Sequence, residues 1–312
     1  MITLTFDLGG TGLRARVGAQ GQTLAEFSAG GYSADVTLNE QLLAVAHRAA
    51  EVSGVRRFDA MAGGLTGVHG AVPNIDVPAA RLKAEFGVRR LIVADDALTS
   101  YFGALGDDAG VVAAIGTGLV VLGRGRAGHF ARVDGLGPMV GDEGSGWWIG
   151  RQGLIAAFSA VDGRDHGSPM LLSAARARYG PTQEIPGLLA HAPSPHAAVA
   201  AFAIDVAEAA RAGDVTAKSI WVSATEFIAR AISAGAERAE LTPPLNYALL
   251  GGIGRATDLL EPRLSVALRS RFERVKRILP RGTGLDGAAA LLHLDKIDPP
   301  NPLIRYITLT EG

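Results

Sequence analysis

The chain contains no cysteine among its 312 residues. This absence excludes disulfides, thiol nucleophiles, iron–sulfur clusters and zinc sites built on cysteine. Long apolar runs are also missing, since none approaches the roughly 18 consecutive apolar residues that a membrane-spanning helix needs. The first ten residues lack the basic region and the apolar length of a secretion signal. We therefore expect a cytoplasmic protein without a membrane partner.

An excess of either charge is lacking as well. The 30 Lys and Arg residues and the 31 Asp and Glu residues leave a net charge of −1, so we expect no nucleic-acid partner. The seven histidines show none of the spacings that are typical of metal sites. No G-x-x-x-x-G-K-[ST] segment occurs, which excludes a Walker-type phosphate-binding loop.

The apolar residues that are present, 48% of the chain, follow a pattern that occurs twice. Period-two runs predict short antiparallel strands at residues 2–7, 13–19 and 23–27. Strand and helix patterns then alternate, with strands at 58–65 and 91–94 and helices at 39–52, at 77–86 and from about 97. A second cycle of strands begins at Gly110 and leads into helices, with starts predicted at Ser145, Ser194 and Asp214.

This repetition predicts an α/β protein of two similar halves with a cleft between them. We expect an N-terminal domain over residues 1–107, joined by a returning helix at about 284–295. The second domain is predicted to cover residues 108–283. Residues 296–312, which contain Pro-Pro-Asn-Pro, are predicted to form a surface tail.

Three glycine-rich turns, each after a predicted strand, carry the main functional signal. They are Asp7-Leu8-Gly9-Gly10-Thr11-Gly12, Gly116-Thr117-Gly118 and Gly251-Gly252-Ile253-Gly254. Any one of them alone is typical of a tight hairpin or a packing glycine. Two such turns in corresponding places of duplicated halves can instead hold a polyphosphate through backbone N–H groups. A dinucleotide-binding fold is disfavoured, because Gly10-x-Gly12 leads into a strand and not into a helix.

The ordered set DLGGT, DDALTS, IGTG, GDEGSG and LLGGIG resembles the N-acetylglucosamine and glucosamine kinases of the BadF/BadG/BcrA/BcrD ATPase family. That family belongs to the actin, Hsp70 and sugar-kinase superfamily. The resemblance extends from Asp7 to about Leu292. It implies two ribonuclease-H-like (actin-like ATPase) domains, with ATP and a sugar meeting in the cleft between them.

The resemblance also implies roles for individual residues. The phosphates of ATP would be bound by Gly9, Gly10, Thr11, Gly116, Thr117 and Gly118, and its adenosine by Gly251 and Gly252. Asp7 would hold Mg²⁺. Asp96 matches the family's catalytic aspartate in a D-A-x-x-S stretch, and a carboxylate there can also accept the proton of a sugar hydroxyl. Helix capping remains an alternative role for both Asp95 and Asp96.

Sugar contacts are implied for a second set of residues, namely Asp35, Thr66, Gly67, Asp96, Asp142 and Glu143. Asp142 or Glu143 can alternatively cap the helix that follows. Asp35 stands where relatives that bind N-acetylglucosamine carry Asn, and a carboxylate is better suited to a protonated 2-amino group than to an acetamide.

We therefore predict ATP-dependent phosphorylation of glucosamine or N-acetylglucosamine at the 6-hydroxyl. The alternatives are a kinase for another sugar, such as N-acetylmuramic acid, or a non-catalytic sensor that binds ATP and sugar. For such a sensor we would expect a DNA-binding helix-turn-helix, which the sequence does not offer before its first strand. The family's activator ATPases are excluded because their cluster needs cysteine. Homodimers are common among relatives, and the sequence leaves the oligomeric state open.

Overall fold

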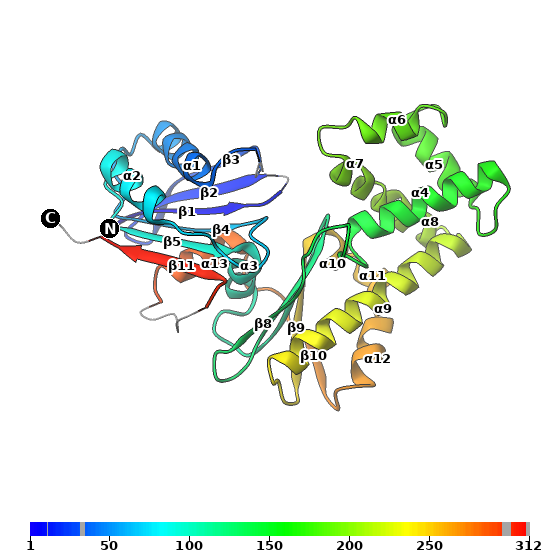
Figure 1. Ribbon diagram of the computed structural model, residues 1–312. Coiled ribbons are helices and arrows are strands. Elements are labelled where there is room, and N and C mark those ends of the chain that lie inside the picture. Colours follow the sequence, from blue (N-terminus) through cyan, green and yellow to red (C-terminus); the bar gives the residue numbers. More distant parts are fainter. Residues whose placement is uncertain (11, 32–34, 295–300, 310–312) are drawn as a thin grey trace. The chain divides into compact units, whose positions relative to one another are not determined.

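The computed structural model describes residues 1–10, 12–31, 35–294 and 301–309. The chain divides into two compact units, one of residues 1–108 with 279–312 and one of residues 109–278. Each unit contains one β-sheet with helices packed on it (Figure 1). The predicted α/β class is therefore confirmed.

The first unit has a six-stranded sheet of order β11-β5-β4-β1-β2-β3. Its strands are β1 (Ile2–Leu8), β2 (Leu13–Ala19), β3 (Gln22–Ala29), β4 (Ala60–Leu65), β5 (Arg90–Asp95) and β11 (Ile304–Thr308). Strands β1, β4 and β5 run parallel, whereas β2, β3 and β11 join the sheet in antiparallel pairs. The predicted meander of the first three strands is confirmed.

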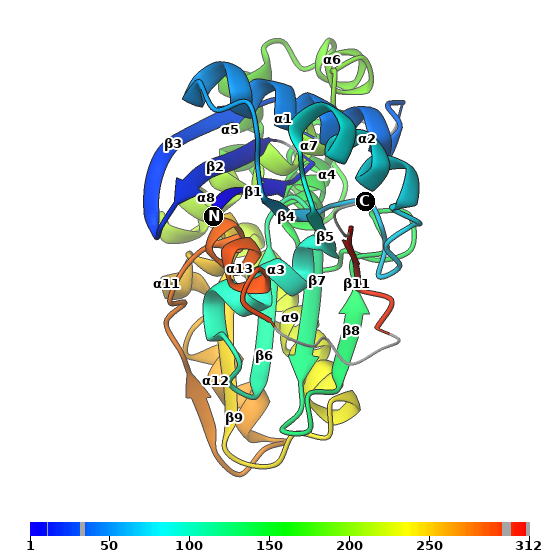
Figure 2. The same ribbon diagram turned by 90° about the vertical axis from the view of Figure 1, so that its left-hand side faces the viewer.

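Helices cover both faces of this sheet. They are α1 (Leu38–Ser53), α2 (Asp76–Phe86), α3 (Asp96–Leu105) and α13 (Gly284–Leu291). Helices α1 and α2 lie on one face, and α3 and α13 lie on the other (Figures 1 and 2). Leu42, Ala46 and Ala49 of α1 are fully buried, as its apolar spacing predicts.

The contact between α3 and α13 is close because both helices present glycine to each other. A Cβ atom at Gly287 would overlap the carbonyl oxygen of Thr99, and one at Gly103 would overlap the carbonyl oxygen of Thr283. Helix α13 is thereby packed against α3, the helix that begins at Asp96.

The prediction of a surface tail is wrong for residues 304–308, which form β11 at the edge of the first sheet. Their Ile-Arg-Tyr-Ile-Thr pattern suits a strand, since β-branched and aromatic residues are favoured there. The preceding proline-rich stretch concealed this pattern. The backbone just before β11 also bonds, because Asp95 N donates to the carbonyl oxygen of Leu303 at 2.8 Å.

The second unit has a five-stranded sheet of order β10-β9-β6-β7-β8. Its strands are β6 (Gly110–Ile115), β7 (Leu119–Arg124), β8 (Phe130–Asp134), β9 (Leu245–Leu250) and β10 (Val275–Arg277). Strands β6, β7 and β8 form an antiparallel meander, and β9 lies parallel to β6. The two sheets therefore begin with the same connectivity.

Most of the second unit is helical. Its helices are α4 (Gly146–Asp162), α5 (Pro169–Tyr179), α6 (Ile185–Ala190), α7 (Pro195–Ala201), α8 (Ala203–Arg211), α9 (Val215–Arg238), α10 (Gly251–Gly254), α11 (Thr257–Leu260) and α12 (Arg263–Arg269). The predicted starts at Ser145, Ser194 and Asp214 are confirmed as the N-caps of α4, α7 and α9. Across the described residues, no helix combines the length and the apolar character needed to cross a membrane.

Candidate functional site

The carboxyl-terminal ends of the parallel strands of the first unit lie side by side and form one edge of their sheet. The predicted carboxylates lie at this edge. Asp7 of β1 pairs in register with Gly64 of β4, which pairs with Ala94 of β5. Asp7 and Ala94 are thus two strands apart, or about 10 Å at the usual strand spacing. Asp95 and Asp96 follow Ala94 directly, so the sheet brings the carboxylates to one edge.

The first glycine turn follows β1 at this edge. Gly9 N donates to the carbonyl oxygen of Gly12 at 2.9 Å, which closes the turn, while Thr11 lies outside the described residues. Gly31 packs so tightly against the turn that a Cβ atom there would lie 2.6 Å from Gly12 N and 2.7 Å from the carbonyl oxygens of Gly9 and Gly10. The sequence analysis missed this contact, although the pair Gly30-Gly31 was a signal for it.

Asp7 is well placed to hold a cation. Burial raises the pKa of its carboxyl, and Arg14, which lies opposite it in register on β2, opposes this shift. Mg²⁺ in phosphoryl-transfer enzymes is held by one or two carboxylates together with substrate phosphates, so a single aspartate beside a turn that is predicted to bind phosphate fits the ion. No cluster of three or more metal-ligating side chains occurs among the residues that the structure describes.

Asp95 and Asp96 have different environments. The buried carboxylate of Asp95 caps α3 by accepting from Ala97 N at 2.9 Å, and it also accepts from Gly70 N at 2.9 Å. Asp96, the first residue of α3, is partly exposed. The capping role that the sequence left open for both residues therefore belongs to Asp95.

Asp95 also forms a hydrogen bond with the loop that contains two of the predicted sugar contacts. Thr66 N donates to the carbonyl oxygen of Leu8 at 3.0 Å, and Gly67 adopts a positive φ of 77°. The same loop reaches Gly70, which donates to Asp95. Asp35 is an exposed residue a short distance along the chain from Gly31.

The second unit brings its two predicted nucleotide-binding turns together. The turn at residues 116–118 is closed by Gly116 N, which donates to the carbonyl oxygen of Gly118 at 3.0 Å. Gly251, with a φ of 82°, lies against it, because a Cβ atom at Gly251 would fall 3.0 Å from Gly116 N. Gly116 and Gly252 are both exposed, so their backbone is accessible to a ligand.

Asp142 and Glu143 differ in burial, as Asp95 and Asp96 do. The carboxylate of Asp142 is buried and accepts from Leu119 N at 3.0 Å, whereas Glu143 is exposed. Burial raises the pKa of Asp142, and the nearby charge of Asp134 adds to the increase. Neither residue caps α4, because Ser145 accepts from Trp148 N in that role.

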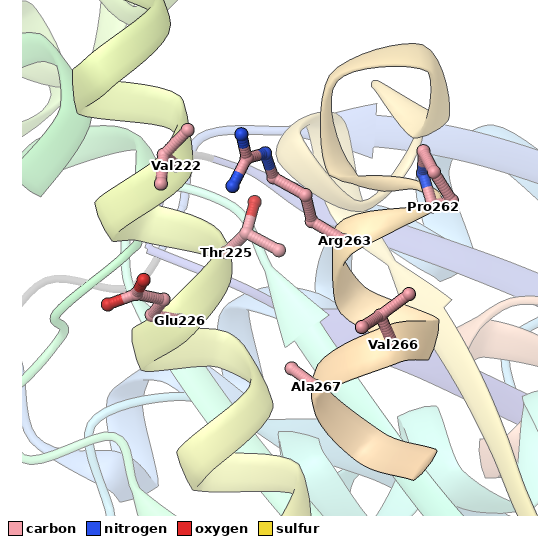
Figure 3. A pocket seen from close by; sticks show the side chains of 7 residues that line it. All are labelled: Val222, Thr225, Glu226, Pro262, Arg263, Val266 and Ala267. Atoms are coloured by element: carbon pink, nitrogen blue, oxygen red, sulfur yellow. The ribbon is translucent and has the colours of Figure 1, made fainter. Parts of the chain in front are cut away.

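A separate pocket in the second unit lies between α9 and α12 (Figure 3). Val222, Val266 and Ala267 form apolar walls, and Glu226 and Arg263 bring charge to it. None of the residues predicted to bind ATP, sugar or metal lines this pocket.

Solved structures of similar fold cover nearly the whole chain. A crystal structure described as a candidate N-acetylglucosamine kinase from Chromobacterium violaceum is 28% identical, with a TM-score of 0.73 over 94% of this chain and 99% of that one. A ROK family glucokinase from Streptomyces griseus, solved with glucose and AMPPNP, is 20% identical with a TM-score of 0.59 over 93% of this chain and 99% of that one. The latter likeness concerns the fold alone.

A curated relative matches over a shorter stretch. It is the N-acetylmuramic acid/N-acetylglucosamine kinase of Clostridium acetobutylicum, 37% identical over 75 residues. The matched stretch spans 24% of this chain and about a quarter (24%) of the relative's own length.

The family match covers most of the chain. Residues 6–291 match the BadF/BadG/BcrA/BcrD ATPase family, a range that includes the whole second unit, most of the first and every predicted site residue. This chain therefore belongs to the BadF/BadG/BcrA/BcrD ATPase family.

Proposed function

We propose that the protein is an ATP-dependent sugar kinase that phosphorylates an amino sugar, glucosamine or N-acetylglucosamine, at its 6-hydroxyl. Membership of an ATPase family supports the use of ATP. The similar structure from Chromobacterium violaceum and the partial relative from Clostridium acetobutylicum support an amino sugar as acceptor.

The observation that carries the proposal is the difference in burial and hydrogen bonding between the adjacent Asp95 and Asp96. A general base must reach the hydroxyl whose proton it accepts. Asp95 is buried and engaged by two backbone N–H groups, whereas Asp96 is partly exposed at the edge where β1, β4 and β5 end. We therefore assign proton acceptance to Asp96.

The glycine-rich turns are the segments that we propose to bind the nucleotide. We assign the phosphates of ATP to Gly9, Gly10 and Thr11 in one unit and to Gly116, Thr117 and Gly118 in the other. We assign the adenosine to Gly251 and Gly252, which adjoin the second turn. Backbone N–H groups in such turns bind phosphate oxygens without a charged side chain.

Asp7 would hold Mg²⁺, which when bound neutralises charge on the phosphate oxygens. The reaction itself is a direct transfer. The sugar hydroxyl gives its proton to Asp96, its oxygen forms a bond to the γ-phosphorus, and the bond from that phosphorus to the bridging oxygen breaks to release ADP. Backbone N–H groups of the turns would stabilise the charge that spreads over the transferred group.

Substrate choice is assigned to Asp35 together with Thr66 and Gly67. A carboxylate at position 35 would form a charge-assisted hydrogen bond with a 2-ammonium group. An acetamide offers no positive charge to this carboxylate. The proposal therefore favours free glucosamine over its acetylated form.

The test is a coupled assay of ADP release with glucosamine, N-acetylglucosamine, N-acetylmuramic acid and glucose as acceptors. We expect turnover with an amino sugar. A proton–phosphorus correlation NMR spectrum of the product should place the phosphate on O6. Asp96→Asn is the catalytic control and should still bind nucleotide. Release of ADP with none of the four sugars, despite measured nucleotide and sugar binding, would favour the non-catalytic sensor.

A further inference from the structure

Residues 302–305 lie beside the end of β5, next to Asp95. They comprise the start of β11 and the two residues before it, and β11 lies beside β5 (Figure 2). Leu303 and Ile304 are each only 5% exposed. The family match ends at residue 291, so the role of this 302–305 segment has to follow from its own contacts.

The 302–305 segment holds the loop that follows β4 through both backbone groups of Val72. The backbone N–H of Val72 donates to the carbonyl oxygen of Pro302 at 2.9 Å, and the carbonyl oxygen of Val72 accepts from Arg305 Nε at 3.3 Å. The other end of the loop is fixed by Thr66 N, which donates to the carbonyl oxygen of Leu8 at 3.0 Å. The loop is thus held at both ends, by β1 and by the 302–305 segment.

The same segment bonds to the backbone of Asp95. The carbonyl oxygen of Leu303 accepts from Asp95 N at 2.8 Å. The carboxylate of Asp95 in turn accepts from Gly70 N of the loop at 2.9 Å. The segment, the loop and Asp95 are therefore bonded to one another in all three pairings. Asp96, the proposed base, follows Asp95 directly, so the position of its backbone depends on these bonds.

The 302–305 segment is itself held in place, as a group that positions others must be. Leu303 N donates to the side-chain oxygen of Asn301 at 3.0 Å, and Ile304 pairs in register with Ala94 of β5. The pairing with β5 continues to Thr308. The segment is therefore anchored both by a side chain directly before it and by the sheet.

Covering the free edge of β5 would need only the pairing between β11 and β5. The bonds of Pro302 and Arg305 to Val72 lie outside that pairing. They reach the loop that contains Thr66 and Gly67, both of which we assign to the sugar. The segment therefore does more than protect an edge.

We infer that the 302–305 segment is a positioning element for the sugar, because it fixes the loop at residues 66–72 and the backbone that leads into Asp96. This inference rests on the proposed function, which assigns sugar contacts to that loop and proton acceptance to Asp96. The bonds of Pro302, Leu303 and Arg305 described above do not involve the turns assigned to ATP. We therefore expect the segment to act on the sugar and not on the nucleotide.

The test compares Arg305→Ala with Arg305→Gln. Ala removes the donor to the carbonyl oxygen of Val72, whereas Gln places an uncharged amide nitrogen at the same point along the side chain as Nε. We expect Arg305→Ala to raise the KM for glucosamine or N-acetylglucosamine, whichever is the better acceptor, by about three- to tenfold. The Kd for AMPPNP, measured by calorimetry, should stay within about twofold of the wild type. Arg305→Gln should restore the KM for the sugar to within about twofold.

Tyr306→Thr is the matched control, because Tyr306 is 51% exposed on the same strand and Thr is also suited to a strand. It should change neither constant. An unchanged KM for the sugar in Arg305→Ala would overturn the inference. So would equal losses of sugar and AMPPNP binding, which would indicate a general loss of structure, or a Gln variant as impaired as the Ala variant.

Leu303→Asp is a stronger perturbation of the same segment. It places a carboxylate at a buried apolar position and should displace residues 302–305. We expect kcat/KM for the sugar to fall by about 10–100-fold while AMPPNP binding is retained, since the loop and the start of α3 both lose a fixed position. A normal kcat/KM with a displaced segment would contradict the inference. The Arg305 variants, in which an exposed residue is changed, keep the test decisive if Leu303→Asp does not fold.

Hydrogen–deuterium exchange separates this inference from the proposed function. A peptide that contains Gly70 and Val72 should exchange faster in Arg305→Ala and in Leu303→Asp than in the wild type, and this can be measured even if no sugar is phosphorylated. Faster exchange in a protein without sugar kinase activity would refute the assignment of the loop to a sugar and leave its fixation by the segment intact. Unchanged exchange in both variants would overturn the inference, whatever the activity.

Discussion

Removing the carboxylate of Asp95 should destabilise the first unit by a calculable amount. Asp95→Ala deletes a helix N-cap, a change that typically costs about 1 kcal/mol. It also leaves Gly70 N without its carboxylate acceptor, and because Gly70 is only partly buried this costs about 1–2 kcal/mol, the lower part of the range for a buried donor. With both contacts at 2.9 Å in the wild type, we expect a total loss of about 2–3 kcal/mol.

Asp96→Asn should behave in the opposite way. A substitution at a partly exposed position usually changes the free energy of unfolding by less than about 0.5 kcal/mol. Loss of the general base should nevertheless lower kcat by about 10²–10⁴-fold. Asp95→Ala should lower kcat less, by roughly 10–100-fold, because it disturbs the placement of Asp96 and of the loop at residues 66–70 without removing the base.

The assay must report on the correct unit. All three tryptophans, Trp147, Trp148 and Trp221, lie in the second unit, so their fluorescence does not monitor the surroundings of Asp95. Hydrogen–deuterium exchange of peptides that contain Gly70 and Ala97 gives this local readout. Urea unfolding followed by far-ultraviolet circular dichroism, which reports on the helices of both units, gives the overall loss of stability. We expect faster exchange in both peptides for Asp95→Ala and no change for Asp96→Asn.

Two results would refute this reasoning. A loss of less than about 1 kcal/mol in Asp95→Ala would mean that the two contacts do not stabilise the fold as derived. A fully active Asp96→Asn beside an inactive, normally folded Asp95→Asn would exchange the roles of the two aspartates.

Four further predictions concern other parts of the structure. Because burial raises the pKa of Asp7, the wild type loses stability as the pH rises from the ordinary aspartate range through the raised pKa. Asp7→Asn should therefore have a higher Tm than the wild type at pH 7, and this difference should disappear in acid. Equal pH profiles of Tm for the two proteins would contradict this. Magnesium with ATP should raise the Tm of the wild type more than that of this variant. Asp35→Asn should shift relative kcat/KM toward N-acetylglucosamine, and an unchanged ratio would remove Asp35 from substrate choice. Gly287→Ala should cost about 1–3 kcal/mol by forcing a methyl group against the carbonyl of Thr99, and a wild-type urea midpoint would show that α13 can shift freely.

Much of the fold could be predicted from local sequence patterns. The first three strands and the helix starts at Ser145, Ser194 and Asp214 follow from apolar period and from capping residues, which act over a few positions. Strand β11 could not be predicted in this way. Its pairing with β5 joins residues more than 200 positions apart, and the prolines before it suggested a loop.

The candidate site was predictable in composition but not in its internal contacts. Motif order identified Asp7, Asp96 and the glycine-rich turns. That Asp95 bonds to Gly70, or that Asp142 bonds to Leu119, depends on which loops the sheets bring together, and no short-range pattern encodes this. Assignment of these residues to ATP, metal or sugar remains a prediction.

The first unit is discontinuous in sequence, and this affects how the protein can form during synthesis. Residues 109–278 constitute the second unit without interruption, so a ribosome completes that unit before the last segment of the first has been made. Helix α13, which packs against α3, and β11, which extends the sheet beyond β5, arrive only afterwards. The carboxylate edge of the first sheet therefore acquires these surroundings only after the second unit has been synthesised, and a nascent chain halted before residue 279 would lack them.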